Sequence, residues 1–233
     1  MEKFLFSDVG HFRYERKFYI QELDRAQVES IIMAHPSLFR EIYHQRFVNN
    51  IYFDSINMQH YFDNIDGLAR RFKVRVRWYG KPTGLLENPM LELKFKHNMH
   101  VGKLLYPLEA FVLDEKSSMP AIQGIFERAP SLPDGLRLYL KELNFSLFNR
   151  YSRKYFLSAD RRYRITVDSG LQAYELKGFG NNFLRATEPS DTIIVELKYN
   201  KDQGKEVDFI TNYFPFRLTR SSKYTAGIEA LTE

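Results

Sequence analysis

One stretch of the sequence, residues 69–79, constrains the fold more than any other because cationic and apolar side chains alternate along it. In an extended strand, successive side chains point to opposite faces, so one face of this stretch would be apolar. The other face would carry four cations in succession, namely Arg71, Lys73, Arg75 and Arg77. Like charges on one face repel each other. We therefore expect an anion to compensate them, either a polyanionic ligand or carboxylates on neighbouring strands.

An exposed edge strand would explain these cations if they stood alone, because lysine and arginine at sheet edges discourage aggregation. Other segments, however, alternate apolar residues with charges of both signs: residues 13–20, 91–96, 163–168 and 195–199. Strands that each have one apolar and one ionic side suggest a sheet closed on itself, with the ionic sides inward. The expected fold is α+β, a closed antiparallel β-barrel with a charged interior and helices packed outside.

Apolar periodicity and turn residues divide the chain into strands and short helices. Strands are expected at residues 11–20, 47–54, 69–79, 90–96, 101–112, 145–157, 163–168 and 191–199. Helices are expected at residues 24–35, 118–144, 206–213 and 221–229, with one helical turn at 57–61. Asp24 would cap the first helix, and Pro107 would mark a bulge or an edge in its strand.

The composition is that of a folded protein. Of 233 residues, 44% are hydrophobic and 15% are aromatic, enough to bury a core. We expect a single domain over residues 1–233, with a helical insert at about 118–144. The absence of cysteine fits a reducing compartment, and no apolar run approaches the roughly 20 residues of a membrane span. The first residues are too polar for a signal peptide, so we expect a cytoplasmic protein that does not insert into a membrane.

The common catalytic motifs are missing from the sequence. It contains no glycine-rich loop ending in Gly-Lys-Ser or Gly-Lys-Thr, no Gly-x-Ser-x-Gly, and no histidines at paired metal-ligand spacing. What remains is a set of lysines and arginines with a few carboxylates, at a formal net charge of +5. Phosphoryl transfer suits such a set, because it needs mainly positioning and neutralisation of charge on phosphate oxygens.

Two glutamates, Glu92 and Glu196, each precede an inward-facing lysine by two residues. Carboxylates among cations would repel phosphate directly, but they fit if they hold a divalent metal that bridges to it. A cross-strand salt bridge inside the barrel is the alternative role for both.

Eight motifs, taken in order, resemble the VTC domain, the polyphosphate polymerase branch of the triphosphate tunnel enzymes. The first is Glu15-Arg16-Lys17, and the rest lie at residues 50–54, 71–77, 91–94, 151–153, 164–168, 195–198 and 222–224, so the resemblance spans about residues 14–227. It implies a tunnel of antiparallel strands in which the γ-phosphate of ATP is transferred to a growing inorganic polyphosphate chain, assisted by Mn²⁺ or Mg²⁺.

The resemblance also implies roles for individual residues, which would line the tunnel. We assign catalysis to Lys17, Arg75, Arg77, Lys94, Arg164 and Lys223. Substrate binding is assigned to Glu15, Lys73, Tyr151, Arg153, Lys198 and Ser222, and metal binding to Glu196 and Glu92. Free backbone N–H groups near the start of the last helix would add to anion binding at Lys223.

Two other functions stay open. One is a triphosphatase with water as the acceptor; Arg13 stands where hydrolytic relatives tend to carry a further glutamate, which argues mildly against it. The other is a polyphosphate-binding module without catalysis. We expect no nucleic-acid partner, since Phe72 and Trp78 lie on the face opposite the cations and could not stack bases beside them. Eukaryotic relatives carry a phosphate-sensing domain and transmembrane helices, so this chain would act alone or with a separately encoded membrane partner.

Overall fold

An eight-stranded antiparallel sheet forms the centre of the structure, a computed structural model that describes residues 13–97, 100–181, 183, 185–200, 206–220 and 222–232. In spatial order its strands are β1 (Arg13–Ile20), β10 (Ile193–Asn200), β9 (Arg164–Tyr174), β8 (Asn144–Leu157), β2 (Arg40–Asp54), β3 (Arg70–Tyr79), β5 (Met90–His97) and β6 (His100–Pro107). A small second sheet pairs β4 (Gly84–Leu86) with β7 (Phe111–Leu113). The expected α+β class with antiparallel strands is confirmed.

The sheet is not closed, so the prediction of a closed β-barrel is wrong: β1 and β6 are its two edges. Leu218 forms a bridge with Phe18 on the free edge of β1, and the Thr219 N–H donates to the carbonyl of Lys17 at 2.9 Å. This returning segment occupies backbone groups that β6 would need for closure. Side-chain alternation indicates which face of a strand is buried, but not which segment pairs with its edge.

The helices of the described residues are α2 (Arg25–Met33), α3 (Gln59–Ile65), α4 (Met119–Arg128), α5 (Asp134–Lys141), α6 (Val207–Asn212) and α7 (Lys223–Thr232). Asp24 caps α2 as expected, accepting from the Gln27 N–H at 2.9 Å. The single strand expected at 101–112 is instead two strands: β6 ends at Pro107, which has no N–H for the ladder, and Phe111 begins β7 in the second sheet. Strand β2 begins at Arg40 instead of Phe47.

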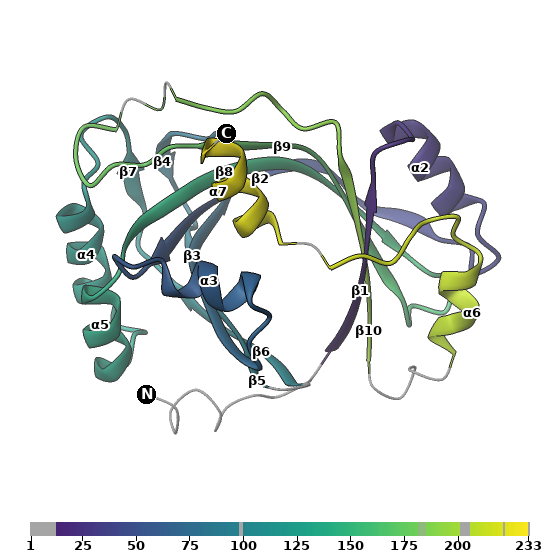
Figure 1. Ribbon diagram of the computed structural model, residues 1–233, viewed down its shortest axis with the longest axis horizontal. Helices are drawn as coiled ribbons and strands as arrows, with labels where there is room; N and C mark the ends of the chain where they lie inside the picture. Colours follow the sequence, from purple (N-terminus) through teal and green to yellow (C-terminus); the bar gives the residue numbers. More distant parts are fainter. Residues whose placement is uncertain are drawn as a thin grey trace.

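Apolar side chains cover the outer side of the curved sheet in two separate cores. One core joins β2, β3 and β5 to α4 and α5, through residues such as Val74, Val76 and Ile122. The other joins β1, β9 and β10 to α2 and α6, through residues such as Val195 and Ile210. In Figure 1 these helix pairs lie at opposite ends of an arch, with α3 and α7 between them. The alternation in the sequence therefore places the apolar sides outward.

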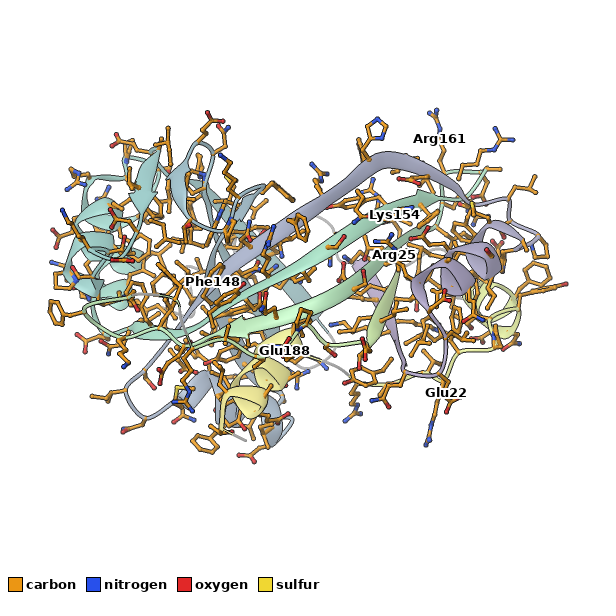
Figure 2. All side chains as sticks on the ribbon, turned by 90° about the horizontal axis from the view of Figure 1, so that it is seen from above. Glu22, Arg25, Phe148, Lys154, Arg161 and Glu188 are labelled. Carbon is orange, nitrogen blue, oxygen red and sulfur yellow. The ribbon has the colours of Figure 1, made fainter. Side chains whose placement is uncertain are left out.

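An ion network fastens one of these helices to the outer side of the sheet. Glu29 of α2 lies 2.8 Å from the Lys154 ammonium of β8 and 3.2 Å from the Arg25 guanidinium. Figure 2 shows Arg25 and Lys154 on the same end of the molecule, beside α2. Lys154 is thus a structural cation, although it is next in sequence to Arg153 of the inner side.

Helix α7 packs on the inner side of the sheet. Tyr224 stacks on Tyr52 of β2, with ring centroids 4.8 Å apart, and its hydroxyl donates to buried Asp54 at 2.6 Å. A Cβ added to Gly227 would lie 2.7 Å from Leu147 Cδ2, so glycine permits this close approach. These contacts hold Lys223, the first residue of α7, against the sheet. Within the described part of the chain, no helix is long and apolar enough to cross a membrane.

Candidate active site

The strand register gathers the predicted ionic residues on the inner face of the sheet. In an antiparallel pair, residues directly opposite each other share a face. Lys17 of β1 lies opposite Glu196 of β10, Glu15 lies opposite Lys198, and Lys198 in turn lies opposite Arg164 of β9. On the other half of the arch, β3 contributes Lys73, Arg75 and Arg77, and β5 contributes Glu92 and Lys94. Tyr151 and Arg153 come from β8, Lys223 begins α7, and Ser222 directly precedes that helix.

Glu196 is buried at the centre of a group of four cations. Its carboxylate lies 2.9 Å from Lys198 Nζ and 3.1 Å from Lys223 Nζ. Arg153 follows at 3.5 Å and Lys17 at 3.7 Å. Burial acts to raise the pKa of Glu196, but these cations together hold it well below its usual range. The side chain of Glu196 is therefore ionised at neutral pH.

A second buried carboxylate, Asp168, was missing from the predicted site. Arg153 binds it through two nitrogens, with Nη2 2.6 Å from Oδ2, and Lys223 Nζ also lies 2.6 Å from Oδ2. Burial acts to raise the pKa of Asp168, and Arg153 and Lys223 lower it below its usual value. The sequence does indicate its position, because alternation along β9 places Asp168 on the same face as Arg164 and Thr166.

Glu92 holds together the cations of the other half of the arch. Arg75 Nη2 lies 2.6 Å from Glu92 Oε2, and Arg77 Nη1 and Lys103 Nζ lie 3.1 and 3.3 Å from Oε1. The pKa of Glu92, which burial would raise, is held far below its usual range by Arg75 and the other cations. This geometry favours the salt-bridge role that the sequence left as the alternative. Lys103 was not predicted, although its place in β6 opposite Lys94 puts it on the inner face.

Lys73 and Lys94, on the inner face, have no carboxylate within 4 Å among the described residues. Lys94 is partly buried and has neither a hydrogen bond nor an ion pair within 4 Å in that part of the chain, and burial lowers its pKa well below the ordinary value. Lys73 Nζ donates to the Ser222 hydroxyl at 2.7 Å. Burial, followed by the charges of Lys17 and Arg75, lowers the pKa of Lys73 to about 7. Because their charged forms lack a nearby carboxylate, a bound anion would stabilise the protonated forms of Lys73 and Lys94 more than those of the other lysines of the site.

Neutral side chains orient the cations. Tyr52 accepts from Arg75 Nη1 at 3.0 Å, and Asn50 accepts from Arg77 Nε at 3.1 Å. The predicted Tyr151 is buried, with its ring centroid 5.1 Å from Lys223 Nζ and 5.3 Å from Arg153 Cζ. Tyr52 and Asn50 were not predicted, because their role depends on which arginine the fold places opposite them.

The remaining predicted residue, Arg164, lies apart from this cluster. It occupies the first position of β9 and is exposed, so it sits at the rim of the inner face. A cavity of about 620 Å³ lies on the outer side of the sheet, beside Phe148 and Tyr174, and none of the predicted site residues lines it.

The donor chemistry for a divalent metal is present, but a preformed cage is not found in the described residues. No three histidine, cysteine or acidic residues among them are placed to hold a metal together. Both oxygens of Glu196 already face ammonium groups. Mg²⁺-like ions are usually held by one or two carboxylates plus the oxygens of a bound phosphate. The residues thus fit a metal that arrives with an anionic ligand, with Glu196 as its protein ligand.

Comparison with known protein families shows the family to which the chain belongs. The family model for the VTC domain matches residues 12–232, nearly the whole chain. The chain belongs to the VTC domain family. The predicted resemblance is therefore confirmed, and the motif residues 15–17 and 222–224 both lie within the matched range. No curated protein matched the sequence.

Solved structures share the fold of this VTC domain at low sequence identity. A protein from Bacillus halodurans, described as a proposed adenylate cyclase, has a TM-score of 0.53 and 15% identity over 91% of this chain and 94% of that chain. A similarly described protein from Vibrio parahaemolyticus has a TM-score of 0.52 and 12% identity, covering 95% and 99%. A Hippeastrum protein described as having a dominant triphosphatase activity has a TM-score of 0.51 and 12% identity, covering 94% and 95%. These likenesses show the fold.

Proposed function

We propose that this VTC domain is a polyphosphate polymerase that transfers the γ-phosphate of ATP to the end of a growing inorganic polyphosphate chain. The observation that carries the proposal is the excess of cations on the inner face. Nine cations (Lys17, Lys73, Arg75, Arg77, Lys94, Lys103, Arg153, Lys198, Lys223) surround four carboxylates (Glu15, Glu92, Asp168, Glu196). A protein gains nothing from desolvating unpaired cations, so a polyanionic substrate is the natural counter-charge.

The reaction on this face is an in-line displacement at phosphorus. A terminal oxygen of the acceptor chain attacks the γ-phosphorus, the bond from that phosphorus to the β,γ-bridging oxygen breaks, and ADP leaves with the electron pair. Arg75 and Arg77, held rigid by Glu92, present guanidinium groups to phosphate oxygens. Lys94 and Lys223 supply positive charge where negative charge shifts during transfer. A divalent metal held by Glu196 would neutralise further charge on the phosphate oxygens.

A phosphate acceptor suits this site better than water does. Water must lose a proton on attack, whereas a terminal phosphate oxygen already carries negative charge. The carboxylates Asp168 and Glu196 are poor bases, because neighbouring cations lower the pKa of both. Hydrolysis is the second candidate function, and Lys73 favours it, since a pKa of about 7 lets its amine accept a proton from water.

Incubation with ATP and Mn²⁺ tests the proposal, followed by gel separation of anionic polymer and an assay for free phosphate. Polymer supports the polymerase, free phosphate alone supports the triphosphatase, and nucleotide binding without either product supports a binding module. Lys94→Met should lose the product while remaining folded, because it removes an unpaired charge and keeps the side-chain volume. The matched control is Lys116→Met, at an exposed lysine of a loop outside the inner face. Full activity of Lys94→Met would contradict the assignment of the site.

A further inference from the structure

Three tyrosines surround one arginine at the end of the inner face formed by β2, β3 and β8. We call this group, Tyr43, Arg46, Tyr79 and Tyr155, the tyrosine–arginine cluster. Arg46 Cζ lies 5.4 Å from the ring centroid of Tyr43, 4.5 Å from that of Tyr79 and 4.8 Å from that of Tyr155. The rings of Tyr43 and Tyr155 meet edge to face, with centroids 5.6 Å apart and an interplanar angle of 88°.

The cluster leaves aromatic surface and a hydrogen-bonding group unused. Tyr43 is 54% exposed and Tyr79 is 48% exposed, although both flank a buried tyrosine. Arg46 Nε is buried without a hydrogen-bond partner, and within the described residues no carboxylate lies within 4 Å of the guanidinium. Aromatic rings with an arginine between them form a surface on which a further flat ring can stack.

The cluster is continuous with the phosphate-binding part of the site. Arg46 lies directly opposite Arg153 in the β2–β8 pair, so the two guanidinium groups share the inner face. Tyr79 follows Arg77 by two residues on β3 and shares its face for the same reason. A molecule stacked on the cluster therefore has Arg77 and Arg153 as the next cations along the sheet.

The opposite end of β3 has a different character. Arg71 lies opposite Lys96, and burial together with the charge of Arg220 lowers the pKa of both. Arg71 and Tyr79 are eight positions apart on one strand, about 26 Å at the usual rise. This end is cationic and suits a chain of phosphates that carries no base.

We propose that the tyrosine–arginine cluster is a nucleobase-binding subsite, on which a nucleoside triphosphate stacks its base while its phosphates extend past Arg153 and Arg77. The inference rests on the proposed function, because it places the nucleotide donor on the inner face. It also orients the reaction: the donor lies at the Tyr79 end, and the polyphosphate chain lies toward Arg71. Stacking depends little on base identity, so ATP and GTP should bind alike.

The experiment compares a ligand of three linked phosphates that carries a nucleoside with one that carries none, each measured in wild type and in a variant. The affinities of the β,γ-imido analogue of ATP and of tripolyphosphate are measured by calorimetry for wild type and for the double variant Tyr43→Leu/Tyr79→Leu. We expect the variant to lose about tenfold or more in affinity for the nucleotide and to bind tripolyphosphate as wild type does. Retained tripolyphosphate binding also shows that the variant is folded. The control is Phe209→Leu on α6, an aromatic residue that is 54% exposed and outside the inner face, which should change neither affinity.

Each outcome separates the inference from the function on which it rests. If both affinities fall together in the variant, or if neither changes, the base does not stack on the cluster and the inference is overturned. In either case, binding of both ligands by wild type leaves the polymerase proposal standing. If wild type binds neither ligand, the proposed function itself fails.

Discussion

We expect the charge of Lys73 to destabilise the protein when no ligand is bound. Replacing Lys73 by methionine should therefore raise the free energy of unfolding. The pKa of Lys73 falls from the ordinary lysine value of 10.5 to about 7, chiefly through burial and the nearby charges of Lys17 and Arg75. A native pKa below the unfolded one means that the unfolded chain binds more protons between these values. The cost is fully present below pH 7, decreases through that interval and vanishes above the unfolded pKa.

The size of this cost follows from the shift of about 3.5 units, at 1.36 kcal/mol per unit. At pH 7 it amounts to about 4 kcal/mol, and at pH 10 to about 1 kcal/mol. The variant also loses the hydrogen bond from Lys73 to Ser222, which contributes about 1 kcal/mol. We therefore expect Lys73→Met to be more stable than wild type by about 3 kcal/mol at pH 7 and about equally stable at pH 10.

Urea unfolding at both pH values measures this difference, and tripolyphosphate binding measures its functional counterpart. The variant should bind tripolyphosphate less tightly, because the removed charge serves the ligand and not the fold. Lys116→Met, at an exposed lysine, should change stability by less than about 0.5 kcal/mol. A variant that is no more stable than wild type at pH 7 would refute the reasoning that Lys73 is a destabilising cation kept for ligand binding.

Three further predictions concern the carboxylates and the placement of α7. Glu92→Gln should destabilise the protein by about 3–5 kcal/mol because it leaves buried cations unpaired. Tripolyphosphate should stabilise this variant more than it stabilises wild type. An unchanged urea midpoint would argue for a metal-ligand role of Glu92 instead. Glu196→Gln should lower the Mn²⁺-dependent rate at least about tenfold. It should not weaken ATP binding measured without metal, because the lost group is an anion among cations. An equal loss in both assays would favour a purely structural role for Glu196. Tyr224→Phe removes the 2.6 Å hydrogen bond to buried Asp54 and should cost about 1.5–3 kcal/mol in urea unfolding; no cost would show that α7 is held by packing alone.

Local alternation predicted much of the site, because the two faces of a strand are set by the backbone itself. The parity of Arg71 to Arg77 placed these residues on one face, and the same parity in β10 placed Glu196 and Lys198 together. Predictions were less successful where the partner of a group mattered. Asp168 and Lys103 have inward parity, yet their roles follow from meeting Arg153 and Glu92, which lie on other strands.

By itself, the sequence determined that the strands have one ionic and one apolar side, and that the chain is a VTC domain. The faces depend on residue order along single segments, which an extended backbone translates directly into sides of a strand. The family depends on a set of motifs that follow one another along nearly the whole chain. Only the tertiary structure decided that the sheet stays open, with residues 218–219 on the edge of β1. It likewise decided that Glu92 pairs with cations while Lys94 lacks a carboxylate partner among the described residues. The physical reason is that edge pairing and ion pairing depend on distances between strands remote in sequence, and no local pattern encodes those distances.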